Sequence, residues 1–94
     1  MFKMLKTNKF NTIKLKDTES IYAFNKRFNY LLQNVTGCGV PISEDKCKTV
    51  CLRALRQHPD SKILFEVKAM LKEHNQGVAE PLTDVQRKLL REEE

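Results

Sequence analysis

One apolar stripe at helical spacing most constrains the fold of this chain. Between residues 21 and 35, large apolar side chains recur at steps of three, four, three and four positions, and they are Ile21, Phe24, Phe28, Leu31 and Val35. This spacing lines one face of an α-helix, whereas a strand would place every second residue on one face. The stripe therefore predicts an amphipathic helix over about residues 20–35, with a face that other elements must cover.

Two further helices follow the first. Ser43 is a good N-cap with two acids in the turn after it, and an apolar stripe then runs to about residue 57. Pro59 ends this helix, and Asp60 or Ser61 caps a third helix that stops at the Asn-Gln-Gly of residues 75–77. Two glycines and a proline in residues 37–41 separate the first helix from the second. Residues 20–77 are thus predicted to hold three helices.

A fourth amphipathic helix is expected after Pro81, with Thr83 and Gln86 as its capping box. The three glutamates at its end oppose the negative end of the helix dipole, so this end is expected to fray. The segment before residue 17 is expected to be extended or to form a short helical turn. The predicted fold class is therefore all-α: a small bundle of four to five short helices with an extended or short helical N-terminal arm.

The net positive charge comes from the first sixteen residues. They hold five lysines and no acid, and these lysines are Lys3, Lys6, Lys9, Lys14 and Lys16. Subtracting 5 from 17 leaves 12 basic residues, which balance all 12 acids. We therefore expect two regions, a basic arm over residues 1–16 and a helical domain over residues 17–94. A solvated arm is one interpretation, and an RNA contact through these five lysines is the alternative, although nucleic-acid binders usually spread their charge over a folded face.

Composition argues against membrane and disulfide-rich proteins. The chain has no apolar run near the roughly 18 residues that a membrane-spanning helix needs. It has three cysteines, an odd number, and no secretory signal precedes them. We therefore expect a soluble cytoplasmic protein with reduced thiols and no membrane partner.

No group of residues predicts an active site, a metal site or a cofactor. Cys47 and Cys51 lie one helical turn apart with His58 after them, but a fourth zinc ligand is missing, so both are expected to be buried thiols. Gly37 and Gly39 form a G-x-G that lacks the preceding strand of a phosphate-binding loop. The chain is therefore expected not to be an enzyme, with no cofactor and no small-molecule substrate.

The order of several short motifs resembles the capsid part of Gag from copia-type long-terminal-repeat retrotransposons. An extended IKLK is followed by DTES, a helix with FNKRF, a PISED turn, a helix ending in LRAL, and a last segment with PLT and LLREEE. The positions that match the family are Glu19, Ser20, Arg27, Gly39, Pro41, Ile42, Ser43, Glu44, Asp45, Leu52, Arg53 and Leu55. The resemblance covers most of residues 13–94. It implies a retroviral capsid C-terminal-domain-like unit, from a retroelement or a host protein derived from one, that dimerises and helps to build a shell around RNA.

Glu19 and Arg27 also resemble the Glu and Arg of the major homology region of retroviral capsids, which have the same spacing. Leu15 stands where that region has a Gln, which is a departure from the pattern. A carboxylate at a helix entrance and a guanidinium two turns later can fix the corner by charge-assisted hydrogen bonds, with Ser20 between them. The alternative is an N-terminal acid and an unrelated surface arginine.

Self-association requires apolar side chains that the chain's own core leaves uncovered. At about 100° per residue, Tyr30 and Phe65 point away from the apolar stripes of their helices, and Leu52 lies off the edge of its stripe. These three residues are the predicted homotypic interface, with a second copy of the chain as the partner. The alternative is that the N-terminal arm or the last helix covers them within one chain.

Overall fold

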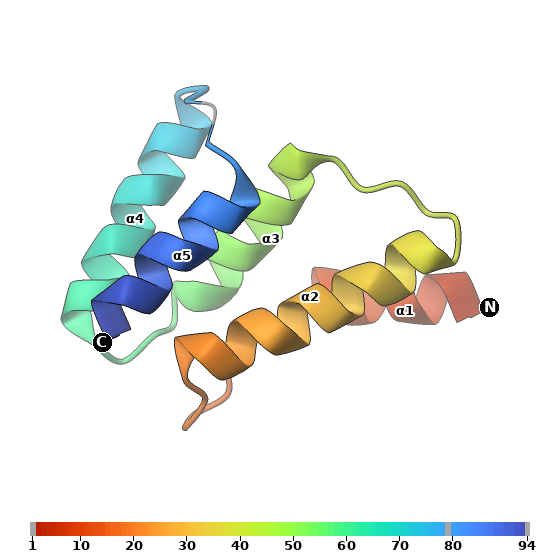
Figure 1. Cartoon of the computed structure of the whole chain (residues 1–94), viewed down its shortest axis with the longest axis horizontal. Coiled ribbons are helices and arrows are strands. Elements are labelled where there is room, and N and C mark those ends of the chain that lie inside the picture. The colour runs from red at the N-terminus through yellow and green to blue at the C-terminus, as the bar shows by residue number, and fades with distance from the viewer. Residues whose placement is uncertain (1, 79, 94) are drawn as a thin grey trace.

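The computed structural model describes residues 2–78 and 80–93, with side chains from residue 7 onward, and in this part of the chain all regular structure is helical (Figure 1). The five helices are α1 (Phe2–Asn11), α2 (Ile21–Gly37), α3 (Glu44–Leu55), α4 (Ser61–Asn75) and α5 (Leu82–Glu93). The all-α prediction is confirmed, and α2 to α5 are the four helices expected from the apolar stripes. None of the described helices has the length and apolar content that crossing a membrane requires.

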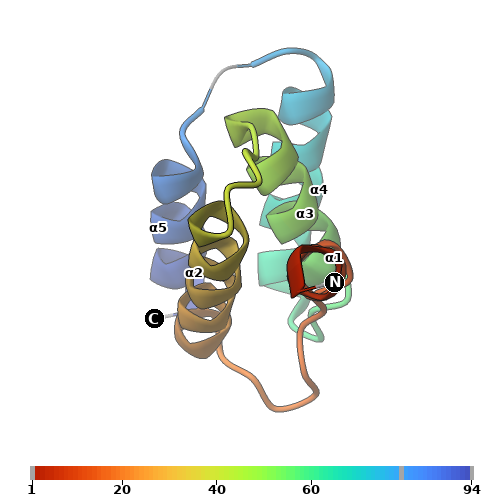
Figure 2. The same cartoon turned by 90° about the vertical axis from the view of Figure 1, so that its right-hand side faces the viewer.

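The helices form two groups that share one core. Helices α3, α4 and α5 gather at one end of the molecule, and α1 and α2 extend from them as an antiparallel pair (Figures 1 and 2). The Cα atoms span 39 × 32 × 17 Å, so the shortest dimension holds only about two helix layers. So thin a molecule leaves one side of most helices in contact with solvent.

The N-terminal segment is packed against the rest of the chain. Phe10 is fully buried, and the centroid of its ring lies 5.2 Å from that of Phe28 in α2. Ile13, just after α1, is also buried in the same apolar core. The interpretation of residues 1–16 as a solvated arm is therefore wrong for these two residues, because a short helix brings Phe10 onto α2 and Ile13 into the core.

Helix α3 is the central element, with buried side chains on most of its circumference. Leu52, predicted to face a partner, is fully buried and lines the same small space as Met70 of α4 and Val85 of α5. The prediction of an exposed Leu52 is therefore wrong. A single apolar stripe assumes one covered face, whereas α3 is covered by both α4 and α5, so a residue off the stripe is also buried.

Three of the predicted helix starts are confirmed. The side chains of Ser20, Ser43 and Asp60 accept hydrogen bonds from backbone N–H groups in the first turns of α2, α3 and α4. Each has an extended backbone that allows its oxygen to reach the helix. Helix α4 ends where expected, at Asn75, and Gly77 shortly after it has a φ of 86°, in the left-handed region that glycine adopts readily.

The capping box expected at the start of α5 is wrong. Thr83 lies inside the helix, which begins at Leu82, and the Gln86 amide donates to the side-chain oxygen of Asn29, 3.1 Å away on α2. The start of α5 is capped by Glu44 of α3, whose carboxylate accepts a hydrogen bond from the N–H of Leu82 at 2.5 Å. At the other end, α5 is helical to Glu93, whose carboxylate accepts from the N–H of Ile21 at 2.6 Å, at the entrance of α2, and the expected fraying stays a prediction.

Candidate functional site

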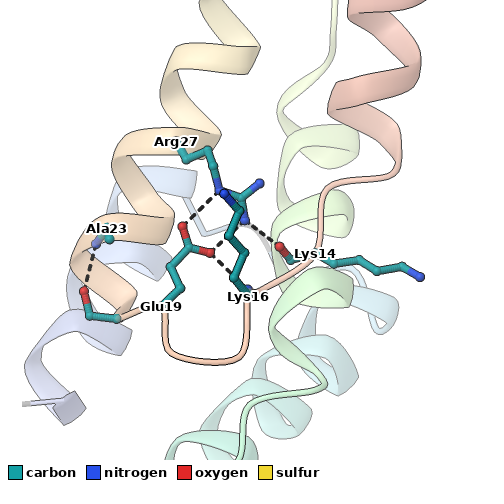
Figure 3. A network of polar contacts seen from close by, with 6 residues as sticks. Lys14, Lys16, Glu19, Ala23 and Arg27 are labelled. Atoms are coloured by element: carbon teal, nitrogen blue, oxygen red, sulfur yellow. Dashed lines mark hydrogen bonds and ion pairs between the residues drawn. The ribbon is translucent and has the colours of Figure 1, made fainter.

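The corner that leads into α2 brings together the residues that carry the resemblance to Gag (Figure 3). Ser20 caps the helix, with its hydroxyl oxygen accepting from the N–H of Ala23 at 3.1 Å. Glu19 stands immediately before the cap and turns towards Arg27, two turns further along α2. The connection from α1 passes beside both charged groups, so this corner joins three consecutive parts of the chain.

Glu19 and Arg27 form a two-point ion pair. Arg27 donates through Nε to one carboxylate oxygen of Glu19 at 2.9 Å and through Nη2 to the other at 2.7 Å. The same Nη2 also donates to the backbone carbonyl of Lys14 at 2.5 Å, and the N–H of Lys16 donates to Glu19 at 3.1 Å. The two side chains therefore fix the path of residues 14–16 onto α2, and the alternative of an unrelated surface arginine is wrong.

The electrostatics of the corner follow from this geometry. The hydrogen bond from Arg27 holds the pKa of the Glu19 carboxyl below its ordinary value of 4.5, although partial burial acts in the opposite direction. The same bond raises the pKa of Arg27. The Glu19 side chain is 8% exposed and that of Arg27 is 27% exposed, so water screens this pair less than it screens a surface pair.

Leu15, the departure from the retroviral pattern, lies between the two backbone groups that the corner uses. Its side chain packs against the apolar core instead of joining the polar contacts. The carbonyl of Lys14 and the N–H of Lys16 supply the hydrogen bonds on either side of it. The corner therefore forms without a glutamine side chain at this position.

Two of the three predicted interface residues are exposed. Tyr30 on α2 is 64% exposed and Phe65 on α4 is 71% exposed, whereas Leu52 is buried as described above. Tyr22, which the sequence analysis did not single out, is 55% exposed on α2, with the Lys26 ammonium 4.6 Å from its ring centroid. In the sequence, this exposure was indicated by the position of Tyr22 outside the apolar stripe of α2. No contact joins Tyr30 and Phe65, which lie on helices in the two different groups.

Three of the five predicted nucleic-acid lysines have side chains that the structure describes. The side chains of Lys3 and Lys6 lie outside the described residues. Lys9, Lys14 and Lys16 are exposed, and the Lys14 side chain points away from the corner (Figure 3). Of these three, only Lys14 lines a hollow that also contains cations from another helix.

The thiols and histidines do not form a ligand set in the described part of the chain. Burial raises the pKa of Cys47 and raises that of Cys51 to about 12, so both are neutral packing groups at neutral pH. Thr49 and His74 share a hydrogen bond of 2.9 Å between the hydroxyl oxygen and Nε2. Among the described residues, no three histidine, cysteine or acidic side chains are placed to bind a metal ion.

Comparison of the chain with known protein families, with curated proteins and with solved structures finds no match. The likeness to copia-type Gag therefore remains a prediction from sequence motifs. The function has to be argued from the geometry of this chain.

Proposed function

We propose that this chain is a structural self-association domain of the kind found in copia-type Gag capsids, or in a host protein derived from one. In this proposal the chain has no active site, and its partner is a second copy of itself. It works by holding copies together in a shell or by altering the assembly of such a shell. Three features of the molecule support the proposal.

The exposed aromatic residues carry the proposal. Tyr30 and Phe65 are 64% and 71% exposed, although both are large aromatic residues of the kind that usually packs in a core. Burial of such rings between copies would remove apolar surface from water. Because they belong to helices in different groups, one molecule offers two separate contacts. Repeated contacts of this kind are what a closed shell needs, since one isologous contact gives only a dimer.

The corner at α2 and the fold give further support. Glu19 and Arg27 have the spacing expected from the resemblance and pair at 2.7 Å. A rigid corner keeps the direction of α2 fixed, and Tyr30 belongs to α2. The small all-α architecture is also compatible with the capsid-like unit that the motifs imply.

Sedimentation analysis of the full chain at rising concentration tests the proposal. We expect the weight-average mass to rise above that of the 11.0 kDa monomer. Tyr30→Ala and Phe65→Ala should each shift the association to higher concentration, whereas Tyr30→Phe, which keeps the ring, should retain it. A chain that stays monomeric at millimolar concentration, or that associates equally well in all three variants, would contradict the proposal.

A further inference from the structure

Two neighbouring hollows on the surface are lined by cations. The first, of about 540 Å³, lies between α3 and α4 and is lined by Arg53, Arg56, Lys68 and Lys72. The second, of about 180 Å³, lies between α3 and the segment after α1, and its cations are Lys14, Lys46 and Arg53. Arg53 lines both hollows, so they form one surface. We call it the basic band, consisting of Lys14, Lys46, Arg53, Arg56, Lys68 and Lys72.

The six charges of the basic band are uncompensated. No aspartate or glutamate lines either hollow. The salt bridges within the described residues involve other cations, namely Arg27, Lys62, Arg87 and Lys88. All six side chains of the band are exposed, so a ligand can reach them.

Many acids of the chain form contacts away from the basic band. Seven of them accept hydrogen bonds or ion pairs at helix ends and between helices: Glu19, Glu44, Asp60, Glu80, Asp84, Glu92 and Glu93. Residues 17–94 carry equal numbers of basic and acidic residues, but all the charged residues that line the two hollows are cations. The folded domain therefore has a basic face, which its net charge does not reveal.

An aromatic ring and side-chain amides accompany these charges. Phe65 is 71% exposed and lies on the same side of α4 as Lys72, about two turns before it, with Lys68 one turn after Phe65. The amides of Asn75 and Gln76 line the larger hollow beside Lys72. Cations in a concave surface with an aromatic ring next to them are the two components from which non-specific single-strand sites are built.

We infer that the basic band binds single-stranded nucleic acid, with phosphates held along the two hollows and a base stacked on Phe65. Arg53 and Arg56 offer planar guanidinium groups that pair with phosphate oxygens by two hydrogen bonds. A flexible phosphate chain fits two hollows joined at Arg53 better than a flat bilayer surface does. This site goes beyond self-association. Phe65 is common to both proposals, but the six cations play no part in the proposed contacts between copies, so the lysine variants test the site separately. It differs from the arm predicted by sequence, since Lys14 is the one arm lysine among the described side chains that lines the band.

Fluorescence anisotropy with a labelled single-stranded RNA of about ten nucleotides tests the inference. The double variant Lys68→Gln with Lys72→Gln should lower affinity on the order of tenfold at low salt, because two phosphate contacts are lost. Each lost contact should also make the plot of log affinity against log salt shallower by about 0.7. Phe65→Ala should weaken binding about fivefold or more without changing that slope, because it removes stacking and no charge.

The matched control is the double variant Lys26→Gln with Arg91→Gln, which removes the same charge from exposed cations outside both hollows. It should bind almost as the parent chain does, and thermal unfolding verifies that every variant is folded. Substitution is preferable to deletion of residues 1–12, which would remove the core residue Phe10. Equal losses in both double variants would mean diffuse attraction and would overturn the inference. A duplex that binds as tightly as the single strand, with no effect of Phe65→Ala, would overturn it as well.

Discussion

The corner at α2 and the basic band use the same kind of residue in opposite ways. Arg27 is 27% exposed and its guanidinium is held by Glu19 and by the carbonyl of Lys14. Arg53 is exposed, lines two hollows and has no acidic partner in the described part of the chain. An arginine whose donors are satisfied within the chain fixes structure, whereas one with free donors is available to a ligand.

The difference depends on where the acids stand. The carboxylates of Glu19, Glu44 and Glu93 lie at the starts of α2, α5 and α2, although Glu93 itself ends α5. There they accept from backbone N–H groups or from an arginine. Carboxylates are favourable at the positive end of a helix dipole. These three acids therefore join helices, and the cations of the basic band have no acidic partner in the described part of the chain.

The largest expected loss of stability comes from a substitution in the segment that leads into the corner. Phe10→Ala should lower the free energy of unfolding by about 3–4 kcal/mol, because it removes a fully buried ring and leaves a cavity against Phe28. Chemical denaturation measures the change. Phe65→Ala is the control, since the same substitution at an exposed site should stay within about 0.5 kcal/mol. Equal, small effects would mean that residues 2–13 do not support the corner.

The ion pair of the corner should have an intermediate effect. Glu19→Gln should cost about 2 kcal/mol, because the partly buried Arg27 then loses its counter-charge while the side-chain shape is kept. Arg53→Gln, which removes a cation of the basic band, should leave stability within about 0.5 kcal/mol. A cost at Arg53 as large as that at Glu19 would remove the distinction between the two regions.

The pH dependence of stability should identify the same pair. The folded pKa of Glu19 lies below its ordinary value of 4.5, so the ionised form is the one that Arg27 stabilises. This contribution is fully present above about pH 4.5 and is lost as the pH falls through the lower, folded pKa. The difference in unfolding free energy between the parent chain and Glu19→Gln should therefore shrink on acidification. A difference that stays constant from neutral pH to pH 3 would contradict the charge-based explanation.

Sequence reasoning succeeded where the information is local. Periodicity predicts the stripe of α2, and residue type predicts the cap at Ser20. The pairing of Glu19 with Arg27 was suggested by the resemblance to the major homology region, and the two residues lie only eight positions apart. It failed for Leu52 and Glu93, whose surroundings come from helices far away in the chain. A single helical stripe carries no information about how many neighbours a helix will have.

The basic band was missed for a different reason. The net charge of residues 17–94 is zero, because 12 basic residues balance 12 acids, so net charge alone does not indicate a basic surface there. A helical projection of the sequence would have indicated the band. Positions 46, 53 and 56 lie along one edge of α3, and positions 68 and 72 lie along one edge of α4. No acid lies on either edge. That these two edges face the same hollow required the structure.

The smallest expected effect on the free energy of unfolding is a stabilisation, and it distinguishes the basic band most clearly from the corner at α2. Lys68 and Lys72 stand four residues apart on α4, where like charges repel by about 0.2–0.5 kcal/mol. Lys68→Glu replaces this repulsion with an acid placed before a lysine, the favourable order, so the free energy of unfolding should rise by about 0.5–1 kcal/mol. The gain should shrink at high salt, because both side chains are exposed.

The same substitution should weaken RNA binding, whereas any substitution of Glu19 should lower stability. If Lys68→Glu instead destabilised the fold, the band would be supporting structure, and its cations would not be free for a ligand.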